Sequence, residues 1–264
     1  RLFDEEDFAA REKYTPPEIQ RTNLAAVILQ TQALGLGQID EFPFLDAPRP
    51  ESIRDGYRTL FEIGALNEGQ ELTPIGRQLA RLPVDPRIGR MLFAAHEEHC
   101  LADLLIIAAA LESQDPRDRP VDKQQMADQA HAQFVDHDSD FLSYLRMWDF
   151  YHDLKAKLSK TQLRKACKQN FLSDIRMHEW QDLHRQLMET VTQAGMKPGR
   201  RRYHAPAADA DPNKQETSQS YAAIHRSLLT GLLSSIALRG DTNEYTAAGN
   251  QKVVLWPGSG VFQT

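Results

Sequence analysis

Apolar residues recur at spacings of three and four along the first third of the chain, which is typical of amphipathic helices. This period predicts helices over residues 15–34, 50–67 and 73–82, with a short turn and strand over 67–73. The side chains expected to face inward in the first two helices are Leu24, Val27, Ile28, Leu34, Ile53, Tyr57, Leu60 and Phe61. Two helices, a turn with a strand, and a third helix outline a small winged-helix unit.

A proline-rich stretch, LTPIGRQLARLPVDPRIGRML, interrupts this pattern at residues 72–92. Proline lacks a backbone donor and ends a helix, but it fits the first turn of one. Pro74 therefore predicts a helix start, whereas Pro83 and Pro86 predict a sharp stop and a restart. The stretch is expected to form a corner between two packed helical units.

Residues 85–196 keep a helical period almost throughout. Two stripes of aromatic and aliphatic residues run through this segment, namely Phe141, Tyr144, Trp148 and Tyr151, and then Phe171, Ile175, Trp180, Leu183 and Leu187. Such rings could stack on nucleic-acid bases, but helical spacing favours packing in a core. The segment is therefore predicted to be a helical bundle.

The chain changes character after residue 203. Residues 204–219 are polar and rich in Ala and Pro, which predicts a flexible linker. An amphipathic helix is expected over 221–236, with Ile224, Leu228, Leu229, Leu232 and Leu233 on one side. Further on, Gly249-Asn250 predicts a turn before the strand KVVLW at 252–256. Two or three strands cannot close a barrel, so this β segment is expected to be incomplete.

The composition is that of a folded protein rather than a disordered one, with 41% apolar and 26% charged residues among 264. The longest apolar run, 101–111, contains Asp103 and is too short to span a bilayer. No signal-peptide pattern is visible, and a start at RLFDEEDF predicts a piece of a longer protein. Cys100 and Cys167 make no disulfide framework, which fits a reducing compartment.

Charge is distributed unevenly along the chain. Residues 1–140 carry 14 Lys and Arg against 26 Asp and Glu, whereas residues 141–264 carry 17 against 11. A polyanion would therefore be drawn to the second half, and especially to the basic runs at 155–168 and 197–202. The alternative for the first run is a solvated helix face.

Several catalytic motifs are missing. The dipeptide Gly-Lys does not occur, so there is no phosphate-binding loop of the GxxxxGK type, and PGSGVF at 257–262 shares only its glycines. His96, His99 and Cys100 could ligate zinc, but no second Cys/His pair completes a site of four ligands. We expect no metal site and no catalytic residue.

Segments along nearly the whole chain resemble, in order, the region behind the motor of DEAH-box RNA helicases, particularly bacterial HrpA-type proteins. The proline-rich stretch and SQDPRDRP at 113–120 carry much of the resemblance. SDFLSYLRMWDFY and KQNFLSDIRMHEWQDLHRQL are similar to the ratchet-like helicase-associated domain, and HRSLLTGLLSSIA through NQKVVLWPGSGVF to the start of an OB-fold domain.

The resemblance implies a mainly α fold, in which a winged helix precedes a helical ratchet-like bundle and a small incomplete β (OB-like) segment follows. The implied domains are the exit from the second RecA-like domain (1–20), the winged helix (21–85), the ratchet-like domain (86–203), the flexible linker (204–219) and a truncated OB-fold start (220–264).

The resemblance also implies a function. The parent would be a cytoplasmic ATP-dependent RNA helicase that unwinds RNA from 3′ to 5′ or remodels ribonucleoproteins, with ATP and Mg bound in motor domains outside this chain. The chain alone is expected to be inactive and to hold no cofactor. Its expected partners are single-stranded RNA, the helicase's own RecA-like domains and, as a further candidate, a protein activator, with no membrane.

Basic residues and one amide are the candidates for contacting RNA, because Lys and Arg give salt-dependent, sequence-independent affinity for its backbone. These candidates are Arg117, Arg119, Asn170, Arg176, Lys197, Arg200, Arg201 and Arg202. For Arg117 and Arg119, the alternative is a set of ion pairs with Asp115 and Asp118.

The other candidates also have structural alternatives. Arg176 could pair with Asp174 or Glu179 on a helix surface, and Asn170 could cap a helix that begins at Phe171. For the whole molecule, the alternative is a protein-interaction scaffold that docks helicase regulators through its acidic half.

Overall fold

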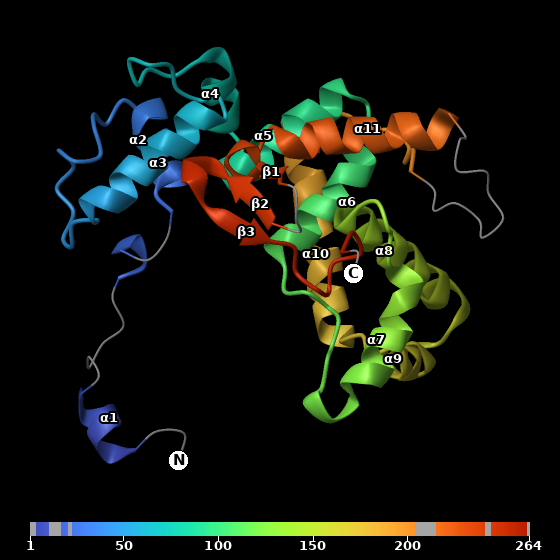
Figure 1. Cartoon of the computed structure of the whole chain (residues 1–264). Helices are drawn as coiled ribbons and strands as arrows, with labels where there is room; N and C mark the ends of the chain where they lie inside the picture. The colour runs from blue at the N-terminus through green and yellow to red at the C-terminus, as the bar shows by residue number, and fades with distance from the viewer. Residues whose placement is uncertain (1–3, 11–16, 21–22, 204–214, 241–243, 263–264) are drawn as a thin grey trace. The chain divides into compact units, whose positions relative to one another are not determined.

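The computed structural model describes residues 4–10, 17–20, 23–203, 215–240 and 244–262 (Figure 1). The chain divides into two compact units, unit 1 (Arg1–Pro86) and unit 2 (Arg87–Thr264). Within the described residues, no helix is both long and apolar enough to cross a membrane. The structure is mainly helical, with a small sheet near the C-terminus, which confirms the predicted fold class.

Unit 1 is made of short helices, and its apolar core contains Ile28, Leu29, Leu60 and Leu79. Its elements are α1 (Glu5–Ala10), the 3-10 turn η1 (Glu18–Gln20), α2 (Ala25–Ala33), α3 (Pro50–Glu62) and α4 (Pro74–Leu79). α2 and α3 pack closely because Gly56 of α3 has no side chain. A Cβ at this position would lie only 2.6 Å from the Ile28 side chain. Leu66 and Leu72 form an antiparallel bridge between α3 and α4. This order of elements matches the predicted winged-helix outline.

The first predicted helix is shorter than its sequence pattern suggests. α2 begins only at Ala25, whose backbone N–H donates to the Asn23 side chain at 2.8 Å. The predicted start at residue 15 lies outside the described residues. Leu34 and Phe61 were expected to face inward, but they are 70% and 53% exposed, because Leu34 follows the last turn of α2 and Phe61 lies on the outer face of α3.

The proline-rich stretch forms the predicted stop and restart. Thr73 caps α4 by accepting a hydrogen bond from the Gly76 N–H at 3.0 Å, and its hydroxyl donates to the Gly64 carbonyl at 2.6 Å. Pro74 occupies the first turn of α4, and α5 (Pro86–Glu97) begins at Pro86.

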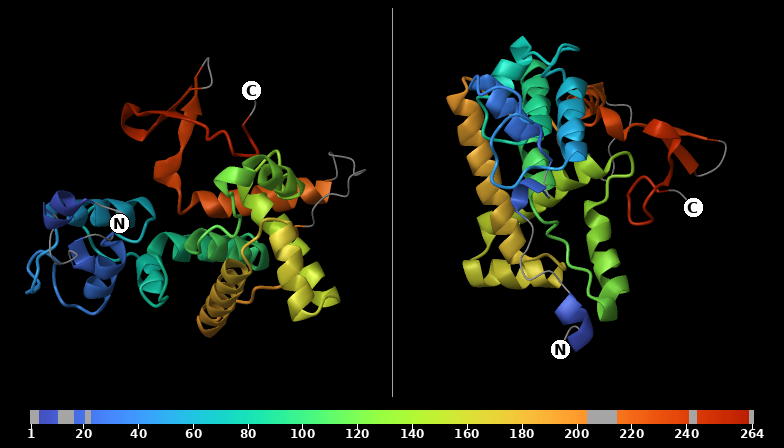
Figure 2. Two further views of the ribbon diagram at one scale, coloured as in Figure 1. Left: turned by 90° about the horizontal axis from the view of Figure 1, so that it is seen from below. Right: turned by 90° about the vertical axis from the view of Figure 1, so that its left-hand side faces the viewer.

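Unit 2 is a helical bundle arranged around α6 (Leu101–Glu112), whose residues 101–110 are all buried. α6 packs against α8 (Asp140–Lys157), α10 (Asp174–Gln193) and α11 (Gln215–Leu229). The remaining elements of the bundle are η2 (Val121–Lys123), α7 (Gln124–His131), η3 (Ala132–Phe134) and α9 (Lys160–Gln169). Figure 2 shows α10 as a long yellow to orange helix along one side of the bundle.

The two predicted stripes lie largely in this core. Trp148, Tyr151 and Trp180 are buried, and the Trp180 indole N–H donates to the Ile106 carbonyl at 2.9 Å. The prediction is wrong for Ile175, which is 66% exposed. The predicted stripe starts at Phe171, but Phe171 belongs to the turn before α10, with a φ of 51°, so Ile175 lies on another face of the helix than the pattern suggests.

A three-stranded antiparallel sheet follows α11, through the 3-10 turn η4 (Leu233–Ser235). Its order is β1 (Ala237–Arg239), β2 (Glu244–Ala247) and β3 (Lys252–Val254). The predicted turn is present as η5 (Ala248–Asn250), where Gly249 and Asn250 both have a positive φ. α11 already begins at Gln215, inside the predicted linker, of which residues 204–214 lie outside the described residues.

Candidate nucleic-acid interface

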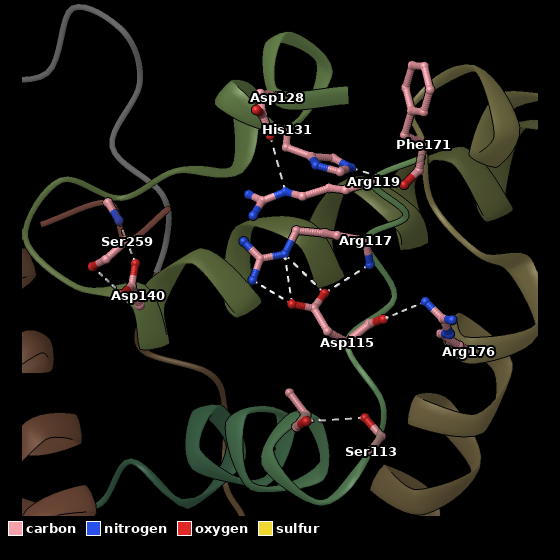
Figure 3. Close-up of polar contacts among 12 residues, drawn as sticks. Ser113, Asp115, Arg117, Arg119, Asp128, His131, Asp140, Phe171, Arg176 and Ser259 are labelled. Carbon is pink, nitrogen blue, oxygen red and sulfur yellow. Dashed lines mark hydrogen bonds and ion pairs between the residues drawn. The ribbon is translucent and has the colours of Figure 1, made fainter. Parts of the chain in front are cut away.

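The first cluster of candidate residues surrounds the loop between α6 and η2, residues 113–120, here called the arginine loop (Figure 3). The loop is fastened to the turn before α10 by two backbone hydrogen bonds. The Asp118 N–H donates to the Phe171 carbonyl at 2.8 Å, and the Ser173 N–H donates to the Pro116 carbonyl at 2.8 Å. This docking brings side chains from sequence positions more than fifty residues apart to one surface.

Arg117 is held by Asp115 within the arginine loop. Its Nε lies 3.0 Å from Oδ1 and its Nη2 lies 2.6 Å from Oδ2, which is a bidentate pair. Burial alone would lower the pKa of Arg117, but the hydrogen bonds to Asp115 outweigh it and raise that pKa. Burial would likewise raise the pKa of Asp115, whereas the bonds from Arg117 lower it. The ion-pair alternative for Arg117 is therefore the one present here.

Arg176, in the first turn of α10, reaches across to the arginine loop. Its Nη1 donates to the Asp118 carboxylate at 3.0 Å and to the Asp115 carbonyl at 3.1 Å. Neither of the helix partners expected from the sequence, Asp174 and Glu179, forms an ion pair with it within the described residues. The pairing follows from the docked loop, which local spacing could not reveal.

Arg119 is the most accessible arginine of the loop. Its Nε pairs with Asp128 of α7 at 3.2 Å, and the two side chains are 36% and 50% exposed. The predicted partners Asp115 and Asp118 are engaged by Arg117 and Arg176 instead. Within the described part of the chain, neither terminal nitrogen of Arg119 has a hydrogen-bond partner, so this end of the guanidinium can bind a ligand.

Asn170 ends α9 rather than beginning the next helix. Its side-chain N–H donates to the Ala166 carbonyl at 2.8 Å, and its side-chain oxygen accepts from Gln133 at 2.9 Å. The cap of α10 is Ser173, so the expectation of a helix that begins at Phe171 is wrong.

His131 supports the same turn and was not among the candidates chosen from the sequence. Its Nε2 lies 3.0 Å from the Phe171 carbonyl and must donate to it, because a carbonyl can only accept. Burial lowers the pKa of His131, which favours this neutral form. His131 and Asp128 were missed because their contacts join separate elements and leave no local pattern in the sequence.

The second cluster of candidates follows α10, in the basic segment 197–202. Asp103 is fully buried and accepts hydrogen bonds from Arg201 Nε at 3.0 Å and from the backbone N–H groups of Arg202 at 2.8 Å and Tyr203 at 3.2 Å. Arg201 also pairs with Asp149 of α8. The contacts of Arg201 are thus those of a structural residue that fixes the segment to the bundle.

Lys197, Arg200 and Arg202 are exposed and line a cleft of about 570 Å³ together with His96 and His99. We call this the basic cleft. No carboxylate among the described residues forms an ion pair with these side chains, so their charge is available to an anion.

The basic cleft does not have the geometry of a zinc site. The Cys100 thiol is buried and lies 3.5 Å from the Ser227 hydroxyl, and burial raises the pKa of that thiol. In the described part of the chain, no group of three or more His, Cys, Asp and Glu residues is arranged to hold a metal ion.

The arginine loop and the basic cleft lie at opposite ends of the paired helices α6 and α10. The cleft adjoins the start of α6 and the end of α10, whereas the loop adjoins the end of α6 and the start of α10. A helix of twelve residues is about 18 Å long. The structure therefore divides the predicted RNA-binding residues into two separate clusters.

Comparison with known families gives a match to part of each unit. The helicase-associated (HA2) winged-helix family matches residues 57–84, and the helicase-associated (HA2) ratchet-like family matches residues 85–144. These matches, together with the fold, define the chain as a helicase-associated region with a winged helix and a ratchet-like bundle.

Individual relatives narrow the assignment. The chain is 43% identical to the ATP-dependent RNA helicase HrpA of Escherichia coli and 41% identical to the HrpA homolog of Haemophilus influenzae, over all of its own length in both cases. It is 33% identical over 74% of its length to the pre-mRNA-splicing factor ATP-dependent RNA helicase DEAH10 of Arabidopsis thaliana, covering 28% of that protein. The chain belongs to the helicase-associated regions of HrpA-type DEAH helicases and spans about a fifth of the two HrpA proteins.

Proposed function

We propose that this chain forms part of the single-stranded RNA channel of an ATP-dependent RNA helicase. The observation that carries the proposal is the arrangement of Arg119, which is fixed on a docked loop yet has its terminal nitrogens free among the described residues. A channel through which a strand slides needs phosphate contacts that ignore sequence, and arginine supplies them. The names of the relatives as RNA helicases support the same reading.

The basic cleft offers the second set of phosphate contacts. Lys197, Arg200 and Arg202 are the candidates there, whereas the paired Arg117, Arg176 and Arg201 act mainly by holding the two clusters in place. Asn170 is oriented by Gln133 and remains a candidate for a hydrogen bond to RNA.

The nucleotide chemistry belongs to other parts of the proposed helicase. ATP and Mg would bind to its RecA-like domains, and this chain would hydrolyse no ATP by itself. Those domains are also proposed protein partners, with an activator as a further candidate and the cytoplasm as the site of action. Exposed apolar side chains on unit 1 support a protein contact there, and these are Leu34, Leu36, Leu45 and Phe61.

Fluorescence anisotropy with a labelled single-stranded RNA across a salt series tests the proposal. The variant K197S/R200S/R202S removes three charges from the basic cleft, and K160S/R164S/K165S removes three from the exposed face of α9 as a matched control. Each lost phosphate contact lowers the slope of log K against log salt by about 0.7 for single strands. We expect the slope to fall by roughly 2 in the cleft variant and to stay unchanged in the control.

Equal losses in both variants would mean that only the overall charge matters and would contradict the proposed cleft. No binding by the wild-type chain at low salt would contradict the proposed RNA-binding role of this chain as a whole.

A further inference from the structure

Trp256 is unusual among the three tryptophans of the chain. Trp148 and Trp180 are buried in the bundle, whereas the Trp256 side chain is 72% exposed, two residues after β3. Among the described residues, no aromatic ring contacts it and its indole N–H has no acceptor. Large aromatic side chains are usually packed, and an exposed one is a candidate for contact with a ligand.

The loop after Trp256 is anchored to the bundle beside the arginine loop. Asp140, the first residue of α8, accepts hydrogen bonds from the Ser259 hydroxyl at 2.5 Å and from the Gly260 N–H at 2.7 Å (Figure 3). Each of the two oxygens of this carboxylate thus accepts one hydrogen bond, from Ser259 and from Gly260. The anchor fixes a segment that lies more than a hundred residues from the arginine loop in the sequence.

Gly258 brings Trp256 and Arg119 together. A Cβ on Gly258 would lie 2.6 Å from Trp256 Nε1 and 3.1 Å from Arg119 Nη1. The indole and the guanidinium are therefore within about 6 Å of each other at these atoms. A side chain at this position would displace the ends of the Trp256 and Arg119 side chains, so Gly258 leaves room for both groups.

An indole face beside a free guanidinium end suits one kind of ligand. Single-stranded nucleic acids offer a base that stacks on an aromatic ring and a phosphate next to it that binds a cation. Stacking on an aromatic side chain is tolerant of sequence, because every base has a flat π face. The partly exposed pair between Arg119 and Asp128 is of the weak surface kind, so a phosphate can replace the carboxylate.

We propose that Trp256 stacks on a base of the bound RNA strand while Arg119 binds the adjacent phosphate. This inference rests on the proposed RNA-binding function and adds to it a base-contacting residue from the C-terminal sheet segment. Gly258 leaves room for the two side chains, and Asp140 holds the loop that carries Gly258.

The experiment compares two ligands of about 12 nucleotides, a labelled oligoadenylate and an abasic ribose-phosphate backbone, by fluorescence anisotropy. The variants are W256A, W256F, G258A and R119S. V254A serves as a matched control because Val254 is equally exposed, at 72%, at the end of β3. Far-ultraviolet circular dichroism and the fluorescence of Trp148 and Trp180 check that each variant is folded.

The two halves of the proposed contact have different signatures. W256A should weaken oligoadenylate binding roughly tenfold or more, with no change in salt slope and no effect on the abasic strand. W256F should retain most of the affinity, because a phenyl ring also stacks. R119S should lower the salt slope by about 0.7 for both ligands. G258A should weaken oligoadenylate binding by less than W256A does, because the displaced indole can still stack.

The inference is overturned if folded W256A binds oligoadenylate as tightly as V254A and the wild-type chain do, or if it weakens both ligands equally. Failure of the proposed function would look different, because the wild-type chain would then bind neither ligand at low salt.

Discussion

At the residue scale, Asp103 is the group on which the position of the basic segment depends. This carboxylate has no contact with solvent and accepts hydrogen bonds from one guanidinium and two backbone N–H groups. Asp103 lies in the apolar run 101–111, and from the sequence its charge only argues against a membrane span there. Its actual partners lie about a hundred residues further on, and nothing in the local pattern points to them.

Replacement of Asp103 by Asn should destabilise unit 2 by about 3 kcal/mol, because it breaks a buried ion pair and leaves Arg201 partly uncompensated. All three tryptophans lie in unit 2, so urea unfolding followed by tryptophan fluorescence reports on that unit. The control is D182N, which removes an exposed pair with Arg185 and should cost at most about 0.5 kcal/mol. Equal effects of the two substitutions would contradict the structural role of Asp103.

His184 gives the bundle a predicted dependence on pH. Its ring packs on Trp148 with the ring centres 4.8 Å apart, and burial, aided by the charges of His152 and Arg201, lowers the pKa of His184 to about 4. As the pH falls, His184 of the unfolded chain is therefore protonated near the ordinary histidine pKa of about 6.5, whereas His184 of the folded chain is protonated only at a lower pH. Stability should fall as the pH is lowered from about 6.5 to about 4.

The urea midpoint of tryptophan fluorescence, measured between pH 7 and pH 4, tests this point. H184Q should flatten the decline, whereas H137Q should leave it unchanged because His137 is exposed. Identical pH profiles for H184Q and the wild-type chain would contradict the assignment.

At the scale of elements, the periodic pattern identifies the helices well, but the positions of their ends depend on caps and turns. Pro74 and Pro86 were sufficient to place α4 and α5, because proline acts through its own ring. α10 begins three residues later than its stripe suggests, because Phe171 adopts a positive φ and Ser173 provides the cap. The turn is joined to the distant arginine loop by backbone hydrogen bonds, which the sequence period cannot show.

Gly76 is the residue that permits the close packing of α4 in unit 1. A Cβ there would lie 2.0 Å from the Ala65 carbonyl oxygen, a contact that only backbone movement could relieve. G76A should therefore cost more than about 2 kcal/mol and speed amide hydrogen exchange across residues 57–82. G69A is the control, because its Cβ would only approach the Asn67 side-chain oxygen, at 3.3 Å. Equal exchange in both variants would contradict this packing.

At the scale of the whole molecule, the two units differ in charge. Unit 1 carries 9 Lys and Arg against 15 Asp and Glu, whereas unit 2 carries 22 of each. The excess of negative charge thus belongs to unit 1, and unit 2 has no net charge. An RNA strand would follow local clusters of unpaired cations on unit 2 rather than a general attraction.

The candidate residues chosen from the sequence could be grouped only after the fold was known. Their chemistry was visible, because Lys and Arg side chains are the usual ligands of phosphate. The sequence did not show which of these side chains are free to bind a ligand. Arg117, Arg176 and Arg201 are engaged by carboxylates, whereas Arg119 has its terminal nitrogens free among the described residues. The exposure of Trp256 beside Arg119 likewise depends on the anchored loop at 257–260.

The most direct test of the RNA-binding account is photo-cross-linking of the chain to a single-stranded RNA that contains 4-thiouridine, followed by mass spectrometry of the cross-linked peptides. The account predicts cross-links in the arginine loop at 113–120, in the basic segment at 197–202 and at Trp256, all lost at high salt. Cross-links confined to unit 1 or to the exposed face of α9 would contradict it.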